Sequence, residues 1–449
     1  MTAIVWLRRD IRLHDHPALA AAVADGPVLP LFVRDPALVR AGEPRRARLE
    51  ASLAAFDAAT DGALVVRAGD PAEVVAGVAA EVGARSVHVT GELTPYARRR
   101  DHRVAERLEA AGIPMVASGT PYAVPPGTLS TGAGTPFQVF TPFSRAWRTH
   151  PVEPPVGPPR ALRWRRTAPS EGLDDELVRI GRSFGPVGES AALERWQEFR
   201  ADGLADYDEG RDRPDLDGTS RLSVHLKHGE IHPRTLLADL RGARGAGARR
   251  FIDELAWREF YADVLWHRPD SAWADLRDAL GTMAYDDADD VQPLVEAWRQ
   301  GRTGYPYVDA GMRQLLETGW MHNRLRMVTA SFLVKDLHVW WPVGARHFLD
   351  HLVDGDLASN NHGWQWVAGT GTDAAPYFRV FNPVAQGRRF DPDGDYVRRW
   401  VPELAHLPGP AVHEPWDHPE GADGGYPERI VDHAAERRTA LERYDAARA

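Results

Sequence analysis

The chain has 449 residues, a formal net charge of −10 at pH 7 and no cysteine. The absence of cysteine excludes disulfides, thiolate metal sites and a cysteine nucleophile. The acidic balance excludes a surface that is basic throughout, so any nucleic-acid site must be a local basic patch. The whole acidic excess lies in residues 121–449, because residues 1–120 hold 15 arginines against 15 acidic side chains.

The N-terminal sequence reaches charged residues after a few apolar ones, and no long apolar run follows. A chain of this length exceeds one ordinary hydrophobic core. We therefore expect a soluble cytoplasmic protein without a membrane partner, built from two domains or from one domain with a large extension.

Residues 1–120 alternate short β-rich runs with helical runs. Predicted strands cover 4–7, 28–33, 64–67, 87–90 and 115–117, and predicted helices cover 45–59, 71–82 and 96–111. This alternation predicts a doubly wound, Rossmann-like α/β domain with a parallel sheet. The stretch lacks both G-x-G-x-x-G and a Walker A motif, which argues against a dinucleotide or a nucleoside triphosphate at its first turn.

Residues 121–169 contain 11 prolines, which predict an extended connector. From about residue 190 the periodicity is helical, as at 192–200, 248–266, 307–317 and 331–340. We therefore expect an α/β domain at 1–120, an interdomain connector at 121–189 and a helical domain at 190–449.

The sequence DGTSRLS at 217–223 places three hydroxyls, on Thr219, Ser220 and Ser223, around Arg221. If a helix begins there, its free backbone N–H groups and these hydroxyls can bind a phosphate. The alternative interpretation is an ordinary helix N-cap, in which a hydroxyl only caps the first turn.

Two further stretches put polar and aromatic side chains on helix faces. In DELAWREFY the side chains of Glu254, Trp257, Arg258 and Tyr261 share one face, where charged groups can also simply pair with one another. In WMHNRLRM, which covers 320–327, one stripe carries Trp, Asn and Met while two arginines point elsewhere, so one helix can touch an aromatic ligand and a phosphate.

His347 and His351 have the i, i+4 spacing of a metal site. Because the glutamate of an H-E-x-x-H motif is missing, we favour ordinary histidines on a helix surface and expect no metal.

Residues 353–383 mix carboxylates, amides and aromatic side chains around a glycine-rich turn. Large flat side chains beside hydrogen-bonding groups suit a planar heteroaromatic ligand. The alternative is a buried loop whose polar groups satisfy one another.

Six motifs occur in this order: DGTSRLS, WREFY, GYPYVDAGMRQL, GWMHNRLRMVTASFLVKDL, DGDLASNNHGWQW and GTGTDAAPYFRVFNP. Together with WLRRDIRLHDHPAL at the N-terminus, they make nearly the whole chain resemble the cryptochrome and photolyase family, and within it the class I DNA photolyases of the cyclobutane pyrimidine dimer type. The resemblance implies an N-terminal α/β domain that can hold an antenna pigment, and a helical domain that holds FAD.

The resemblance also assigns residues to the flavin. Around its phosphates and ribityl chain it implies Tyr207, Thr219, Ser220, Leu222 and Ser223. Around its ring system it implies Arg258, Trp320, Asn323, Arg326, Asp354, Asp356 and Asn360. In this assignment Arg326 pairs with Asp354 beside the ring, and Asn360 faces the flavin nitrogen N5.

The implied reaction is light-dependent repair, in which photoexcited reduced FAD passes an electron to a dimer flipped out of UV-damaged DNA. The resemblance assigns the dimer pocket to Glu254, Trp257, Asn323, Met327 and Trp366, and DNA phosphate contacts to Arg211, Arg324 and Arg379. Catalytic roles fall to Glu254, Asn360, Trp364 and Trp341.

The alternative function is a blue-light flavin photoreceptor of the cryptochrome kind without repair. Asn360 resembles photolyases more than signalling cryptochromes. Photolyases for (6-4) photoproducts are expected to carry two histidines where this chain has Asn323 and Met327, so the dimer type is favoured.

The family's tryptophan chain for flavin photoreduction maps onto Trp364 and Trp341, but its outermost position falls near Ala288. Our hypothesis is that Trp340, Trp298 or Tyr285 replaces it.

For the antenna, 8-hydroxy-5-deazaflavin is favoured over methenyltetrahydrofolate, because GELTPYARRRD at 91–101 resembles the deazaflavin type, with Arg46 and Asp101 as contacts; the alternative is an empty pocket. We further expect a bacterial, nucleoid-associated monomer without an obligate protein partner.

Overall fold

The structure is a computed structural model that describes residues 2–38, 41–166, 168–277, 280–287, 289–373 and 379–448. The chain forms two compact units. Unit 1 consists of Met1–Phe137, Thr141–Ala205 and Ser220–Pro269, and unit 2 consists of Gln138–Phe140, Asp206–Thr219 and Asp270–Ala449. Each unit combines separate stretches of sequence, so this division does not test the expected domain boundaries at residues 120 and 190. Those boundaries stay a prediction.

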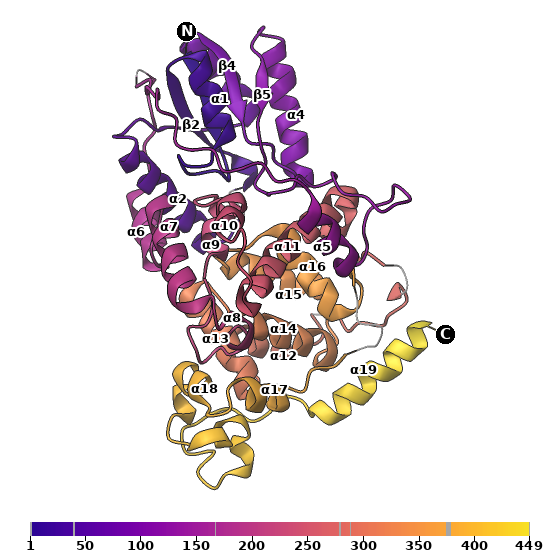
Figure 1. Cartoon of the computed structure of the whole chain (residues 1–449). Helices are drawn as coiled ribbons and strands as arrows, with labels where there is room; N and C mark the ends of the chain where they lie inside the picture. The colour runs from indigo at the N-terminus through magenta and orange to yellow at the C-terminus, as the bar shows by residue number, and fades with distance from the viewer. Residues whose placement is uncertain are drawn as a thin grey trace. The chain divides into compact units, whose positions relative to one another are not determined.

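Unit 1 contains a five-stranded sheet in which every neighbouring pair is parallel, in the order β3-β2-β1-β4-β5 (Figure 1). The strands are β1 (Thr2–Leu7), β2 (Val28–Arg34), β3 (Val65–Ala68), β4 (Ala84–Val89) and β5 (Met115–Ala117). The order reverses direction between β1 and β4, which is the point where α/β sheets of this kind bind ligands.

Four helices cover this sheet: α1 (Pro17–Asp25), α2 (Glu43–Ala59), α3 (Pro71–Glu81) and α4 (Pro95–Glu109). Alternate residues of β1 face opposite cores. Ile4 and Trp6 pack with residues of α3 and α4, whereas Val5 and Leu7 pack with residues of α1 and α2. Both faces of the sheet are therefore buried, which confirms the predicted doubly wound fold.

The rest of unit 1 is helical. It contains α6 (Asp175–Ser183), α7 (Glu189–Glu198), a π-helical turn at Phe199–Gly203, α9 (Ser223–His228), α10 (Pro233–Asp239) and the long α11 (Ala246–His267). The proline-rich connector also holds a helix, α5 (Phe140–Thr149), which the proline count did not predict. Pro142 lies in the first turn of α5, where a missing N–H group breaks no helical hydrogen bond.

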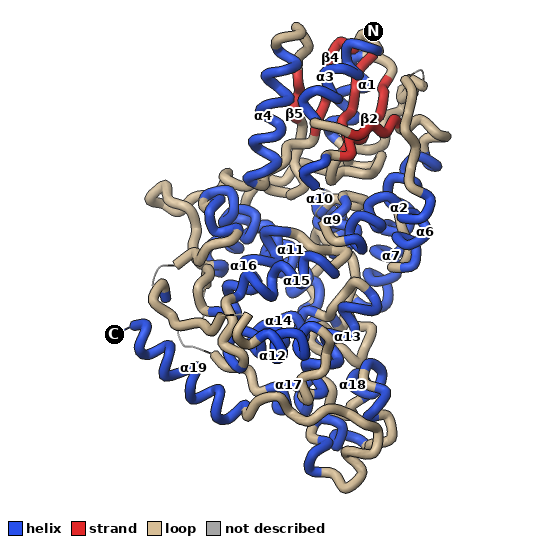
Figure 2. Tube along the Cα trace, turned by 180° about the vertical axis from the view of Figure 1, so that it is seen from behind, coloured by secondary structure: helices blue, strands red, loops and turns tan. Residues whose placement is uncertain are grey.

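Unit 2 is helical, and among the described residues the named strands all belong to unit 1 (Figure 2). Its helices are α8 (Tyr207–Gly210), α12 (Gln292–Arg299), α13 (Pro306–Thr318), α14 (Asn323–Ser331), α15 (Trp341–His351), α16 (Leu357–Ala368), α17 (Pro383–Phe390), α18 (Asp395–Trp400) and α19 (His433–Arg448). Their shared core is rich in aromatic side chains, including Trp298, Trp341, Phe348 and Trp364.

The helix predicted at 331–340 is confirmed as far as Asp336 and wrong beyond it. Helix α14 ends at Ser331, Phe332–Asp336 forms a π-helical turn, and His338 adopts a positive φ of 52°. Val339 then forms a parallel β-bridge with Asp286. Residues 331–339 are all buried, so the apolar run reflects burial on every side rather than one face of a helix.

None of the helices in the described part of the chain is long and apolar enough to cross a lipid bilayer.

Candidate functional site

Arg326 and Asp354 form a buried ion pair in unit 2. Arg326 lies on α14, and its Nη2 donates to both carboxylate oxygens of Asp354 at 3.1 and 2.8 Å. Its Nε donates to the Met321 carbonyl at 2.8 Å, which fixes the direction of the guanidinium. The Asp354 side chain is only 2% exposed, while that of Arg326 is 24% exposed. A partly accessible cation is therefore held in place by a buried carboxylate.

Helix α16 begins directly after this pair. Asp356 is its N-cap, and its carboxylate accepts from Ser359 N at 3.1 Å. The amide nitrogen of Asn360 donates to the Ala345 carbonyl at 3.1 Å and to Asn361 Oδ1 at 2.8 Å. Because both bonds use the amide nitrogen, they set the direction in which the Asn360 carbonyl oxygen points.

The far side of α16 is fixed by buried polar contacts. His362 Nε2 lies 2.9 Å from Ser271 Oγ, and Gln365 donates to the Ser271 carbonyl at 2.7 Å. Gln365 also accepts from Leu276 N at 2.9 Å. Burial lowers the pKa of His362 to about 4, so this histidine is neutral at pH 7. These contacts hold the helix that carries Asn360, Trp364 and Trp366.

The arginines predicted to contact DNA phosphates differ in their surroundings. Arg324 Nη2 lies 2.9 Å from Asp212 Oδ1, and its guanidinium stacks on Phe390 at 4.2 Å. Arg211 Nε lies 3.7 Å from the same Asp212 oxygen. Arg379 is exposed, and its backbone carbonyl accepts from the buried Lys335. Asp212 was not predicted, although its position directly after Arg211 could have suggested it.

The remaining predicted pocket residues of unit 2 lie on or near α14. Asn323 is exposed at the first position of α14, with its amide nitrogen 4.0 Å from the Met327 sulfur. Met327 and Trp366 are half-buried, and both pack against the core of the unit. Trp320 is half-buried, and its ring meets His322 edge-on at 6.2 Å.

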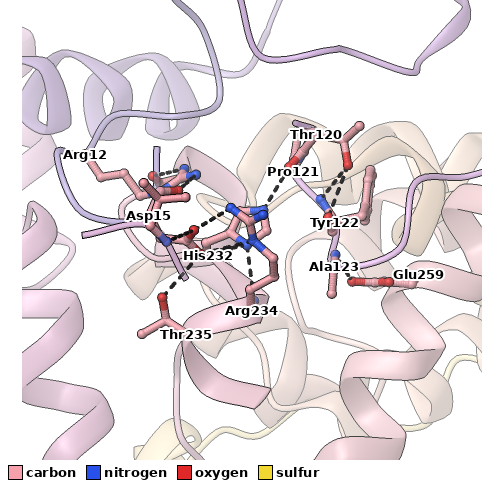
Figure 3. Close-up of polar contacts among 12 residues, drawn as sticks. Arg12, Asp15, Thr120, Pro121, Tyr122, Ala123, His232, Arg234, Thr235 and Glu259 are labelled. Atoms are coloured by element: carbon pink, nitrogen blue, oxygen red, sulfur yellow. Dashed lines mark hydrogen bonds and ion pairs between the residues drawn. The ribbon is translucent and has the colours of Figure 1, made fainter. Parts of the chain in front are cut away.

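In unit 1, the DELAWREFY residues lie on α11. Glu254 is 3.8 Å from Arg250, and the Trp257 ring lies 5.4 Å from that of Tyr261. Arg258, which the resemblance assigns to the cofactor, donates to the backbone carbonyls of Pro121 at 3.1 Å (Figure 3) and Leu226 at 3.4 Å. In the described contacts Arg258 therefore holds the connector and α9.

The residues assigned to the flavin phosphates are divided between the units: Tyr207, and Thr219 of DGTSRLS, belong to unit 2, while Ser220, Leu222 and Ser223 of DGTSRLS belong to unit 1. Helix α9 begins at Ser223, and its N-cap, Leu222, provides no side-chain hydrogen bond. The Ser220 hydroxyl instead accepts from Leu222 N at 3.3 Å, so a hydroxyl of the motif does satisfy the backbone just before the helix, as the cap interpretation expects in part. Arg221 has a positive φ of 53°, a strained conformation for a non-glycine residue that is common at ligand sites.

The tryptophans assigned to electron transfer lie in unit 2. Trp364 is 3% exposed and packs against Phe348 at 4.9 Å and Trp298 at 6.1 Å. Trp341 is fully buried and donates to Asp275 Oδ1 at 2.6 Å. Trp340, whose ring lies 6.2 Å from that of Trp341, donates to the same oxygen at 3.3 Å and is 40% exposed.

Of the other hypothetical replacements, Trp298 is fully buried and donates to the Thr329 carbonyl at 3.0 Å. Tyr285 is half-buried, and burial raises the pKa of its hydroxyl. Ala288 lies outside the described residues.

Polar groups also gather at the carboxyl ends of β1 and β4. Arg8 lies 3.4 Å from Asp101, and its guanidinium stacks on Trp6 at 4.5 Å. Thr90 donates to Asp10 at 2.5 Å. Arg46 Nε is buried without a hydrogen-bond partner among the described residues. A charged cluster of Arg8, Asp10 and Asp101 therefore lies at an edge where α/β sheets bind ligands, while Arg46, on α2, has no described contact with it.

His347 and His351 do not form a metal site in the described residues, where no group of three potential ligands occurs. The expectation that both lie on the helix surface is wrong for His347. Its ring packs 5.3 Å from Trp298, and burial lowers its pKa to about 3.

A doubly wound α/β unit, and a tryptophan-rich helical unit with a fixed arginine–aspartate pair, define the class: a protein with an α/β part and a helical cofactor-binding part. Comparison with family models identifies the family to which the chain belongs. Residues 3–160 match the model described as DNA photolyase, and residues 251–446 match the FAD binding domain of DNA photolyase.

Curated relatives match over almost their whole length. The chain is 45% identical to the deoxyribodipyrimidine photo-lyase of Streptomyces griseus, with 98% of each chain covered. It is 40% identical to that of Escherichia coli K12, covering 100% of this chain and 99% of the relative. The chain therefore belongs to the DNA photolyase family.

Solved structures agree. A class III photolyase from Agrobacterium tumefaciens superposes with a TM-score of 0.93 at 38% identity, covering 99% of this chain and 97% of that one. A Synechocystis cryptochrome superposes with a TM-score of 0.87 at 28% identity, covering 98% of each chain. A photolyase and a cryptochrome thus share this fold. The helical part of this chain is an FAD-binding domain.

Proposed function

We propose that this protein repairs cyclobutane pyrimidine dimers in DNA by a light-dependent reaction that uses FAD. The observation that carries the proposal is the near-complete, 45% identical match to a deoxyribodipyrimidine photo-lyase. The photoreceptor alternative has less support, because the cryptochrome neighbour is only 28% identical.

The residues present fit FAD. The flavin ring needs hydrogen-bonding groups with fixed directions, which Arg326 and Asn360 offer because Asp354 and Ala345 hold them. The phosphates need N–H donors and hydroxyls, which the first turn of α9 offers because no side chain caps it. When bound in its reduced form, FAD supplies the electron on illumination.

Arg326 keeps a positive charge beside the ring site, and Asp354 keeps that charge in place. A fixed cation favours a negatively charged ligand, which is the electron-rich form that repair requires. Asp356 and Asn323 would complete this edge, and Asn360 would face N5 of the flavin. Trp320, Arg258 and Tyr207 are proposed to complete the flavin surroundings, although Arg258 also has the structural contacts described above.

Binding of the dimer is assigned to Glu254, Trp257, Asn323, Met327 and Trp366. A dimer pairs and stacks badly, so extruding it costs less than flipping normal bases, and aromatic side chains recover part of a cost of a few kcal/mol. Glu254 is proposed as a catalytic residue that contacts the dimer. Arg211, Arg324 and Arg379 are the proposed phosphate contacts.

We propose the class I subclass, which the motif resemblance implies. The dimer type is supported by Asn323 and Met327, which stand where (6-4) photolyases are expected to carry histidines. The class III name of the Agrobacterium structure is the competing subclass. We propose 8-hydroxy-5-deazaflavin as antenna, with Arg46 and Asp101 as contacts; the Arg8–Asp101 pair at the sheet edge supports the Asp101 contact. An absorption spectrum of the native protein distinguishes this pigment from methenyltetrahydrofolate.

The function is tested with the purified protein, reduced and mixed with a UV-irradiated oligonucleotide. Illumination should restore the normal bases, and a sample kept in the dark should retain its dimers. Dimers that persist in the light while FAD stays bound would contradict repair and leave the photoreceptor function. The same sample, passed over a sizing column, tests the proposed monomer. Imaging in cells tests the proposed nucleoid association.

A further inference from the structure

Two neighbouring tryptophans of unit 2 share one hydrogen-bond acceptor. The Nε1 of Trp341 donates to Asp275 Oδ1 at 2.6 Å, and the Nε1 of Trp340 donates to the same oxygen at 3.3 Å. The two rings meet edge-on, with their centroids 6.2 Å apart. Because an indole nitrogen is a donor only, one carboxylate oxygen collects the single N–H group of each ring.

The two rings differ in their access to water. Trp341 is fully buried, whereas Trp340 is 40% exposed. The N–H proton of Trp341 is therefore in contact with Asp275 and not with solvent. Asp275 is half-buried, so its carboxylate touches the buried ring on one side and can exchange a proton with water on the other.

Helix α16 holds the loop that carries Asp275. Gln365 of α16 donates to the Ser271 carbonyl at 2.7 Å and accepts from Leu276 N at 2.9 Å. One buried side-chain amide thus spans the loop on both sides of Asp275. The carboxylate is fixed against the two indoles before any electron moves, which is the preorganisation that an acceptor of a proton needs.

Tyr285, the third aromatic candidate for the outermost electron donor, has a different environment. Its hydroxyl is buried and has no hydrogen-bond partner among the described residues. Burial, and after it the charge of Asp275, raises the pKa of this hydroxyl. A phenol loses its proton when it is oxidised, so a hydroxyl without an acceptor is less suited to give up an electron than two indoles that have one.

An indole that loses an electron becomes a much stronger acid at its nitrogen, because the positive charge left on the ring weakens the N–H bond. We propose that Asp275 is the proton acceptor of this tryptophan pair. An electron leaves the pair for the light-excited flavin, the N–H bond of the oxidised indole breaks, and its proton forms an O–H bond with Asp275. The pair has then given one electron to the flavin and one proton to the carboxylate, so atoms and charge balance.

This proton transfer keeps the electron on the cofactor. A cationic indole takes its electron back readily, whereas a neutral radical has to recover its proton as well. The inference rests on the proposed function, because it takes FAD as the light-driven electron acceptor. It goes beyond the repair of dimers, since it concerns how the flavin becomes reduced.

The test uses two substitutions that separate the hydrogen bond from proton acceptance. Asp275→Asn keeps an oxygen that accepts from both indoles but is a far weaker base, and Asp275→Glu keeps a carboxylate. Protein with oxidised FAD is excited by a light flash, and transient absorption distinguishes the protonated from the neutral tryptophan radical. We expect Asp275→Asn to slow the loss of the radical's proton about tenfold or more, and Asp275→Glu to lose the proton faster than Asp275→Asn.

Asp286→Asn is the matched control, because Asp286 is also a half-buried carboxylate of unit 2 but accepts from Arg443 at 2.8 Å rather than from an indole. This variant should leave the proton loss unchanged. Normal proton loss in Asp275→Asn would overturn the inference, since water would then take the proton. Equal slowing in Asp275→Asn and Asp275→Glu would also overturn it, because the cause would be displaced geometry rather than lost basicity.

Failure of the unaltered, reduced protein to repair dimers would instead contradict the proposed function. It would leave the assignment of Asp275 standing, because reduction of the flavin and repair of the dimer are separate steps.

A second measurement needs no illumination. In nitrogen-15-labelled protein kept in the dark, the Nε1–H resonance of Trp341 is assigned with Trp341→Phe. A charged acceptor at 2.6 Å predicts a downfield resonance that exchanges slowly with solvent, and Asp275→Ala should move it upfield. A Trp341 resonance that is not downfield in the unaltered protein would overturn the hydrogen bond on which the inference depends.

Discussion

Asp212 shows how one unpredicted residue changes the expected behaviour of two predicted ones. Its Oδ1 lies 2.9 Å from Arg324 and 3.7 Å from Arg211, so one carboxylate partly neutralises two proposed phosphate contacts. Partly exposed ion pairs are worth at most about 1 kcal/mol. The pairing therefore weakens DNA binding without preventing it.

We expect Asp212→Asn to raise the affinity for undamaged DNA by a few-fold, since removing the carboxylate leaves both cations to the phosphates. Fluorescence anisotropy with a labelled duplex at two salt concentrations measures this, and the gain should shrink as salt rises. Asp215→Asn is the control, because Asp215 pairs with Arg213, which has no proposed DNA role. An unchanged or weaker affinity in the Asp212 variant would show that the pair serves folding instead.

Lys335 is one of two lysines in the chain and is 2% exposed. Burial lowers its pKa from 10.5 to about 7. Between these values the unfolded chain binds more protons than the native one, so the free energy of unfolding rises with pH from about 7 to about 10.5. Burying Lys335 thus costs stability below pH 7.

We expect Lys335→Met to stabilise the protein at pH 6, by at most about 5 kcal/mol from the pKa difference and by less after losing the bond to the Arg379 carbonyl. The gain should nearly vanish at pH 10. Urea unfolding at both pH values measures it, and Lys227→Met, at the other lysine, is the control. A gain that does not depend on pH would mean that Lys335 is not the group whose charge is penalised.

At the scale of elements, the pattern of buried strands could be read from the sequence because each strand is short and apolar and lies between helices. The predicted runs 28–33 and 115–117 coincide closely with β2 and β5. The helix predicted at 331–340 does not extend beyond Asp336. Burial on every side has no helical period, and a positive φ at His338 cannot be read from the residue type.

The sequence allowed only part of the candidate site to be predicted. The resemblance named Arg326 and Asp354, and the structure brings them together. Asp275 was not predicted because its partners, Trp340 and Trp341, lie far away in the sequence. Asp212 was not predicted because its contact with Arg324 depends on the fold, although its neighbour Arg211 could have suggested it. Arg9 and Arg12 donate to the carbonyls of Lys227 and Gly229 at the carboxyl end of α9. Because carbonyls are backbone groups, no residue type could mark these two as contacts.

The segment that leads into α15 bears on the outermost electron donor. Trp340 meets the conditions for a surface donor, because its ring is 6.2 Å from Trp341 and 40% exposed, where solvent can take up the proton its oxidised ring loses. Trp298 is fully buried and lacks that access.

We expect Trp340→Phe to slow flavin photoreduction about tenfold or more and to leave dimer repair by already reduced protein unchanged. Trp298→Phe should leave photoreduction within about twofold. Absorption changes during illumination give the rates, and Trp341→Phe should abolish photoreduction. Normal photoreduction in the Trp340 variant would return the role to Tyr285 or to another residue.

At the scale of the whole molecule, buried histidines are spread through both units. Burial lowers the pKa of His16, His232 and His362 to about 4 and that of His347 to about 3. An unfolded histidine titrates near 6.5, so between these values the unfolded chain binds more protons and stability falls as pH drops. Asp391 opposes this, because burial raises its pKa to about 6.

Near pH 5 the four histidines together with Asp391 contribute about three protons gained on unfolding, or about 4 kcal/mol lost per pH unit; Glu259, Asp309 and Asp336, whose pKa burial also raises, reduce this slope. We expect the urea midpoint to fall steeply from pH 6.5 to 4.5. His347→Phe, which keeps a ring against Trp298, should reduce the slope by about one proton. His102→Gln is the control, since that side chain is 75% exposed. Because Asp391→Asn removes the opposing group, it should make the slope steeper. A slope that none of the buried-site variants changes would mean that acid instability arises from surface charge repulsion rather than from these buried groups.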